Sequence, residues 1–247
     1  MEQTHMKAWT RRDLTIVPLR SQDCIVIACD SCGAVGKKEG DVFKLSPYYV
    51  GKFAARVALT EVMCSGALPV TITNGIACEM QPTGKESILG IEDELKNVGI
   101  TDIVLTGSTE ENFATSMTAL AITVIGISKV SELKFGQAAA GDKLVLLGTP
   151  KVGTEVDLES SGFYTEIRQL LPMPEVKEII PVGSKGVAYE TEMLASLNGM
   201  GCKLDQTNKD YFKSAGPATC LLILCAESAV NRLVHIYQSA KVIGEIA

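Results

Sequence analysis

Hydrophobic residues recur with two different periods along the chain, and the change between them outlines the expected elements. Residues 14–19 and 24–29 are short apolar runs separated by polar residues, a pattern typical of two β-strands. From Pro47 the apolar positions recur every three or four residues as far as Ser65, and Gly66 follows. This spacing predicts one long helix with an apolar face, because helical side chains three and four positions apart share a side.

The rest of the chain alternates between the same two patterns. Thr83 and Glu86 have the spacing of a capping box, which predicts a second helix that ends at Gly99. A stretch rich in small residues at 133–141 interrupts the pattern and indicates a domain junction. Strands are expected at 70–76, 103–105, 117–127, 143–147, 219–225 and 241–246, and further helices at 157–171, 186–197 and 228–238.

Length and composition fit this outline. The chain has 247 residues, of which 46% are hydrophobic and 21% charged, enough apolar content for a substantial core. Strands and helices are mixed in both halves, which predicts an α/β or α+β fold with domains at 1–135 and 136–247. The net charge of -6 argues against a nucleic-acid partner, since such partners are bound through basic residues.

Neither a membrane segment nor a secretion signal is predicted. No run reaches the roughly 18 apolar residues of a membrane helix, and the N-terminal segment is polar. We therefore expect a cytoplasmic protein with no membrane partner, whose eight cysteines remain thiols. Cys29 and Cys32 form a single C-x-x-C pair, which is a weak signal for zinc or redox chemistry without a second Cys or His pair.

Glu61 falls on the apolar stripe of the long predicted helix, four residues before Ser65. A buried carboxylate costs on the order of several kcal/mol unless it is paired, protonated or bound to a metal ion. Two interpretations follow. Glu61 pairs with a lysine or arginine from elsewhere in the chain, or it is a ligand of a hard cation such as Mg²⁺.

Asp30 stands directly after the apolar run at 24–29, at the strand end where α/β sheets usually bind ligands. Gly33, Gly36 and Lys37 follow it, so this segment is suited to bring backbone N–H groups and a cation to a phosphate. A plain turn is the alternative interpretation, because many such loops are rich in glycine and aspartate.

A third polar group follows the strand expected at 103–105, where two adjacent acids come after a Gly-Ser-Thr turn. Such acids bind a cation or cap a helix. A further acid stands before the first strand, flanked by arginines. Carboxylates gathered from strand ends and from a helix face would form the oxygen-rich site that magnesium prefers. The predicted magnesium ligands are Asp13, Asp30, Glu61, Glu110 and Glu111.

The chain contains no P-loop, no G-x-G-x-x-G and no G-x-S-x-G segment, so any nucleotide is bound by another architecture. The segments at 26–30, 58–69 and 104–109, together with 140–148, resemble the aminoimidazole ribonucleotide synthetase (PurM-like) superfamily. The phrase that closes the long helix, an acid, then a small residue, then Gly-Ala-x-Pro, is the most specific element. The resemblance implies a homodimer in which N-terminal sheets pair into a barrel, ATP and Mg²⁺ in a cleft between subunits, and here a shortened C-terminal lobe.

The resemblance also implies roles for single residues. By position, three acids of the family fall on Asp13, Asp30 and Glu61, the last where most members have Asp. Ser108 stands where a fourth acid is usual, with Glu110 or Glu111 as a substitute. The residues expected to contact the nucleotide are Asp13, Gly33, Gly36, Gly107, Ser108 and Thr109.

Lys185 is a second departure, because it replaces the acid of a Ser-Asp-Gly phrase in the C-terminal domain. The departures favour a small-molecule kinase over the synthetases, with the α-ribazole kinases of cobalamin salvage as the leading hypothesis. Such an enzyme transfers phosphate from ATP to a nucleoside-like alcohol, and depends mainly on positioning and charge neutralisation. Lys37 or Lys185 would neutralise charge on the transferred group, with Asp30 beside them in the catalytic set. A thiamine-monophosphate kinase-like or other ATP-using activity and a non-catalytic ATP-binding role remain alternatives.

Overall fold

The computed structural model describes residues 7–100 and 102–247. The chain divides into two compact units, Met1–Leu133 and Lys134–Ala247. Each contains a sheet and helices, which confirms the predicted mixed α+β class. No helix in the described part of the chain is both long and apolar enough to cross a membrane.

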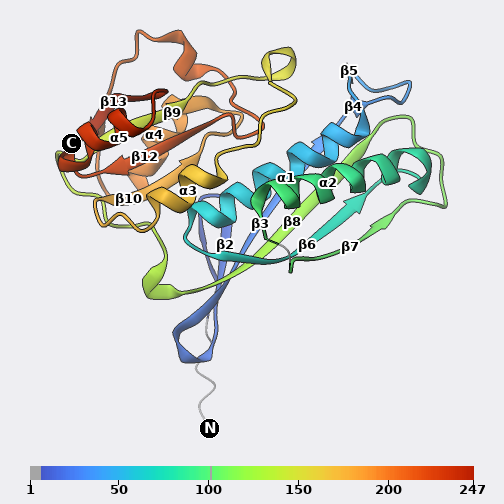
Figure 1. The fold of residues 1–247 in the computed structure, drawn as a ribbon, viewed down its shortest axis with the longest axis horizontal. Coiled ribbons are helices and arrows are strands. Elements are labelled where there is room, and N and C mark those ends of the chain that lie inside the picture. Colours follow the sequence, from blue (N-terminus) through green and yellow to red (C-terminus); the bar gives the residue numbers. More distant parts are fainter. Residues whose placement is uncertain (1–6, 101) are drawn as a thin grey trace. The chain divides into compact units, whose positions relative to one another are not determined.

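Unit 1 is built on a six-stranded sheet with the order β1-β2-β3-β8-β6-β7 (Figure 1). Within this sheet only β6 and β7 run parallel. The strands are β1 (Trp9–Arg11), β2 (Leu14–Pro18), β3 (Asp23–Gly33), β6 (Leu68–Ile76), β7 (Val104–Thr109) and β8 (Ala119–Lys129). Because β3 continues to Gly33, the prediction that Asp30 begins a loop is wrong, and Asp30 lies inside a strand.

Two helices cover one face of this sheet, α1 (Pro47–Cys64) and α2 (Lys85–Val98) (Figure 1). The long helix is as predicted, and α2 ends at Gly99 in the left-handed region, where glycine carries no steric penalty. The predicted capping box is not formed. Thr83 lies in a π-helical turn, Met80–Gly84, and its hydroxyl donates to the carboxylate of Glu79.

Alternation along β3 separates the two faces of the sheet. Cys24, Val26 and Ala28 are buried beneath the helices, whereas Ile25 and Ile27 point to the opposite face and are only partly buried. On that opposite face the neighbouring strands also present apolar side chains at one end. Its most exposed members are Leu68, Val104 and Ile127, at 57%, 64% and 48%.

Unit 2 contains a five-stranded antiparallel sheet with the order β10-β12-β9-β13-β11. Its strands are β9 (Lys143–Gly148), β10 (Val176–Pro181), β11 (Cys202–Leu204), β12 (Cys220–Cys225) and β13 (Ala240–Ile246), and its helices are α3 (Tyr164–Leu170), α4 (Gly186–Leu197) and α5 (Glu227–Ile236). The helix predicted at 157–171 is therefore too long. Asp157 instead accepts hydrogen bonds from Glu159 and Ser160 in a local turn, which competes with helix formation.

Candidate active site

The turn between β1 and β2 brings an arginine to the long helix. The Arg12 guanidinium donates to both carboxylate oxygens of Glu61, with Nη1–Oε2 at 2.9 Å and Nη2–Oε1 at 3.1 Å. The exposed fractions of the two side chains are 4% and 9%. Burial raises the pKa of Glu61, and the guanidinium acts against that rise. Of the two interpretations of Glu61, the structure contains the ion pair.

Two further carboxylates lie near this pair. Burial raises the pKa of Asp30 to about 6, and the negative charges of Glu61 and Asp13 add to the rise. The backbone N–H of Ser31 lowers it in part. Asp13, Asp30 and Glu61, called the acid group below, are therefore brought together by the β1–β2 turn, β3 and α1.

The acid group borders an unpaired strand edge. The register of β2 with β3 ends where Leu14 meets Ala28. From Cys29 to Gly33, β3 has β8 on one side and, within the described residues, no strand on the other. Backbone groups on such an edge are available to a ligand.

Glu110 and Glu111 belong to a different part of unit 1. The carboxylate of Glu110 accepts the backbone N–H groups of Asn112 and Phe113, and that of Glu111 accepts from Met80 and Thr109. Both acids follow β7, and β8 and β6 lie between β7 and β3, so the strands are about 14 Å apart. The predicted five-residue site is not brought together.

A protein-held magnesium ion does not fit this arrangement. Both oxygens of Glu61 are already engaged by Arg12. Within residues 7–100 and 102–247, no three His, Cys, Asp or Glu side chains are grouped as ligands for a metal ion. Of the acids expected to hold magnesium, Glu61 is instead paired with the Arg12 guanidinium.

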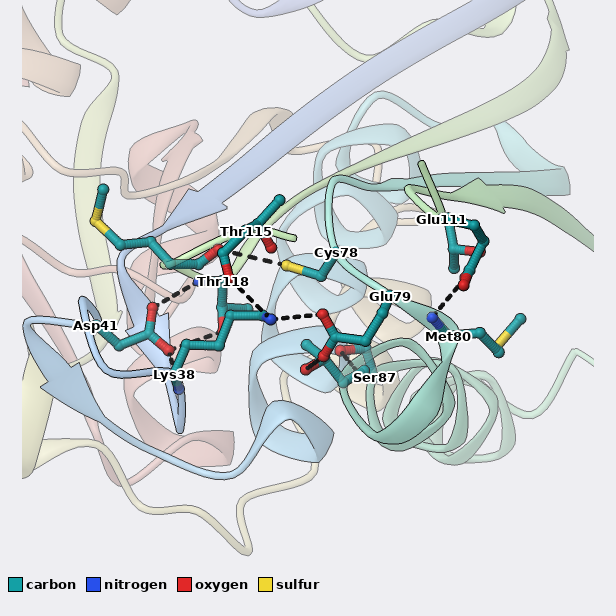
Figure 2. Close-up of polar contacts among 12 residues, drawn as sticks. Lys38, Asp41, Cys78, Glu79, Met80, Ser87, Glu111, Thr115 and Thr118 are labelled. Carbon is teal, nitrogen blue, oxygen red and sulfur yellow. Dashed lines mark hydrogen bonds and ion pairs between the residues drawn. The ribbon is translucent and has the colours of Figure 1, made fainter. Parts of the chain in front are cut away.

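The segment after β3 is tied down by a buried aspartate. Asp41 accepts hydrogen bonds from the backbone N–H of Lys38 and from both the backbone N–H and the hydroxyl of Thr118, at 2.7–2.8 Å (Figure 2). Burial alone raises the pKa of Asp41, but these donors outweigh it and hold the pKa below its usual value. A Cβ at Gly36 would meet Thr118 Oγ1 at 2.2 Å, whereas Gly33 has open space around it. Of the two glycines, only Gly33 leaves room for an approaching phosphate.

Two neighbouring lysines in this segment have different environments. The Lys38 ammonium is mostly buried and donates to Glu79 and to the carbonyl of Thr115, so it joins three loops (Figure 2). The Lys37 side chain is 61% exposed and pairs with Glu86 at 3.0 Å. An exposed pair of this kind is weak and can be exchanged for another anion. Lys37 is therefore the lysine that a ligand can recruit.

The other predicted nucleotide contacts differ in access. Gly107 lies against the Asn74 side chain, which a Cβ at Gly107 would meet at 2.3 Å. Ser108 is exposed, and the Thr109 hydroxyl donates to Glu111. In unit 2, Lys185 is exposed next to Tyr189, with Nζ 4.2 Å from the ring centroid.

Cys29 and Cys32 point to opposite faces of the sheet, because they stand three positions apart in one strand. Cys29 is exposed, whereas burial and the charges of Asp30 and Asp41 raise the pKa of Cys32 to about 11. Two thiols on opposite faces cannot share a metal ion or form a disulfide with each other. The zinc and redox interpretations are excluded for this pair.

Residues 11–128, most of unit 1, match the family model of the N-terminal domain of AIR synthase related proteins. Phosphoribosylformylglycinamidine synthase II of Thermotoga maritima has a similar structure, with a TM-score of 0.74 over 94% of this chain at 15% identity. The fold is PurM-like. The chain spans 42% of that enzyme's length.

Two further solved structures have a similar fold. T. maritima PurL complexed with ATP has a TM-score of 0.71 at 15% identity, covering 94% of this chain and 41% of PurL. E. coli HypE has a TM-score of 0.65 at 19% identity, covering 90% of this chain and 79% of HypE. No curated protein sequence matches the chain.

Sequence reasoning missed one residue of the site. Arg12, which stands next to Asp13 in the sequence, is the partner of Glu61. The signal was the pair of arginines beside an acid, ahead of a helix with a glutamate on its apolar stripe. No rule of spacing relates positions 12 and 61, because the contact depends on how the hairpin lies against the helix.

Proposed function

We propose that this chain is an ATP-dependent kinase that phosphorylates the hydroxyl of a ribosyl-type alcohol, with α-ribazole as the leading acceptor. The observation that carries the proposal is the environment of Asp30, a half-buried carboxylate at an unpaired strand edge, near two other acids. The PurM-like fold and the ATP complex of a structural neighbour support the choice of nucleotide.

Asp30 would act as the general base. Its pKa of about 6 leaves it ionised at neutral pH yet basic enough to share the proton of an alcohol in the transition state. The acceptor oxygen forms a bond to the γ-phosphorus of ATP as the bond to the bridging oxygen breaks, and ADP leaves. The acceptor proton goes to Asp30 and then to water.

Cations would balance the charge that develops on the transferred group. Lys37 is suited to this role because its exposed pair with Glu86 is readily exchanged. Magnesium takes part as the cation of MgATP, the substrate, since the acid group does not fit a resident ion.

The experiment is an ADP-release assay of the purified chain with MgATP and α-ribazole, thiamine monophosphate or no acceptor. We expect release only with α-ribazole, with phosphorylated acceptor detected by mass spectrometry. Asp30→Asn is expected to lower kcat by about 10² to 10⁴ while nucleotide binding persists. Asp23→Asn, at the exposed start of the same strand, is the matched control. Turnover of thiamine monophosphate in place of α-ribazole would show that the proposed acceptor is wrong. No turnover with any alcohol would contradict the kinase proposal.

A non-catalytic ATP-binding role is the second candidate. The pairing of Glu61 with Arg12 favours it, because an acid of the expected magnesium-binding set is already engaged. It predicts ATP binding without ADP release for any acceptor, so the same assay distinguishes the two.

We also propose that the chain forms a homodimer through the uncovered face of the unit 1 sheet. Leu68, Val104 and Ile127 expose apolar surface there, and burying it would be favourable. Sedimentation of the wild type is expected to give a dimer and that of Ile127→Glu a monomer. All eight cysteines are free, which agrees with a cytoplasmic location.

A further inference from the structure

A buried aspartate lies in the segment that follows β3, residues 33–44, which carries the two residues that a phosphate can reach, Gly33 and Lys37. We infer that Asp41 is a positioning residue for nucleotide binding. By accepting hydrogen bonds from Thr118, it holds the backbone of this segment so that Gly33 and Lys37 lie ready beside the unpaired edge of β3. The inference rests on the proposed nucleotide binding and is independent of the acceptor alcohol.

The segment is attached at two points to the residues just before β8. The backbone N–H of Ala34 donates to the carbonyl of Thr118 at 2.8 Å, and that of Gly40 donates to the carbonyl of Ser116 at 2.9 Å. The two loops therefore lie against each other. A group that ties them together controls the path of the segment.

Asp41 ties the two loops at a point that solvent does not reach. Asp41 is 4% exposed and Thr118 is fully buried. One carboxylate oxygen accepts the backbone N–H of Thr118, and the other accepts the Thr118 hydroxyl and the N–H of Lys38 (Figure 2). The backbone at Gly36 passes so close that a Cβ there would meet both Asp41 Oδ2 and Thr118 Oγ1. A buried carboxylate is costly without such donors, so the tie persists as long as the segment stays folded.

The segment needs this tie because its backbone is strained at Ala34. Ala34 has φ of 60°, in the left-handed region that favours glycine. Such a conformation persists only when surrounding contacts fix it. The Ala34 carbonyl accepts the N–H groups of Val42 and Phe43, which directly follow Asp41, at 2.8 and 3.2 Å. Asp41 therefore holds the strained turn that comes immediately after Gly33.

The tie acts on the ligand-binding segment and leaves the proposed base in place. Asp30 pairs with Ile122 in the ladder between β3 and β8, so the sheet sets its position. Gly33 and Lys37 instead lie on either side of the strained residue. A loop that is already held in its binding conformation loses less conformational freedom when the ligand binds. Loss of the Thr118 hydroxyl should therefore weaken nucleotide binding.

The test is calorimetric titration of the full chain with MgATP. Thr118→Val removes the hydroxyl but keeps the backbone N–H and the shape of the side chain, and is expected to raise the Kd by about tenfold. Thr118→Ser keeps the hydroxyl and should bind MgATP as the wild type does. Ser65→Ala, which removes a buried hydroxyl that donates to the carbonyl of Val62 in α1, is the matched control and should leave the Kd unchanged.

A double variant tests the role of the strain. Ala34→Gly added to Thr118→Val should recover part of the lost affinity, because glycine adopts φ of 60° without a holding contact. A general loss of stability would not be relieved at this one position. If Thr118→Val does not fold, Thr118→Cys is measured in its place. Its thiol is a weak donor, so a smaller rise of the Kd is expected.

The outcomes separate this inference from the proposed function. An unchanged Kd in the folded Thr118 variant would overturn the inference, and so would an equal rise in Ser65→Ala or no recovery with Ala34→Gly. A wild-type chain that does not bind MgATP would contradict the proposed nucleotide binding and this inference together. Binding of MgATP without turnover would contradict the kinase proposal alone.

Discussion

Two arginine–glutamate pairs hold helix α1, and their surroundings differ. Arg56 donates to both oxygens of Glu94 on α2, at 2.7 and 3.0 Å, with side chains 3% and 0% exposed. Arg12 makes its two-point contact with Glu61 through the two terminal nitrogens, whereas Arg56 uses Nε and one terminal nitrogen. The Arg56 guanidinium also lies over the Phe53 ring, 4.9 Å from its centroid.

The difference lies in the charges around each pair. Glu94 also accepts a hydrogen bond from the amide of Asn97, and its charge interacts with the Lys52 ammonium. Glu61 and Asp13 instead lie close enough to Asp30 for their negative charges to raise its pKa. A two-point arginine–glutamate contact therefore serves packing in one place and lies beside other acids at an unpaired strand edge in the other. Functional sites often contain such groups with perturbed pKa values, so the surroundings of Glu61 are the better candidate for a functional site.

The largest effect is expected from a variant that removes the glutamate of the Arg56–Glu94 pair. Glu94→Gln removes the carboxylate that accepts both hydrogen bonds from the buried Arg56 guanidinium, which should lower the free energy of unfolding by about 3–5 kcal/mol. Glu61→Gln should cost less, because it also relieves repulsion of Asp30. Urea denaturation of the two variants measures the difference. An equal loss in both would show that the neighbouring acids do not matter.

The second prediction concerns stability against pH at Asp30. Its pKa rises from 3.8 to about 6 on folding, so the folded chain binds the proton more tightly than the unfolded chain. Stability from this group is therefore complete below pH 4 and is lost as the pH rises through 6. Asp30→Asn should raise the free energy of unfolding at pH 7 by on the order of 2 kcal/mol.

Denaturation at pH 4 and at pH 7 provides the check for Asp30→Asn. The gain should shrink strongly at pH 4, where the wild-type carboxyl is largely protonated in the folded chain. Asp23→Asn should show no such gain at either pH. A gain of equal size at both values would mean that the charge of Asp30 is not what destabilises the chain.

The smallest expected effect is on the pKa of Asp30, which should respond to a change at Glu61 and not to one at Glu94. Glu61→Gln removes one of the charges that raise the pKa of Asp30, so that pKa should fall by about one unit or less. Glu94→Gln should leave it unchanged. Carboxyl-carbon NMR titration of Asp30 reads the shift directly, and the acid limb of the pH–rate profile should move with it if Asp30 is the base. A rise of the pKa would contradict the assigned cause.

Sequence patterns determined much of the fold. The limits of α1 and α4 were predicted to within a residue, because apolar spacing, Pro47 and flanking glycines act locally. The class, and the position of Glu61 on a buried stripe, followed from the same periodicity. Patterns failed where local hydrogen bonds compete with helix formation, as at Asp157.

Only the tertiary structure decided the partners of the acids. Whether Glu61 meets Arg12 or a metal ion depends on where a strained turn lies against a helix 49 positions away. The division of Glu110 and Glu111 from the acid group depends on the strand order, which the spacing of residues does not encode. Charges interact through space over several ångströms, whereas a periodic pattern reports only which face of its own element a residue occupies.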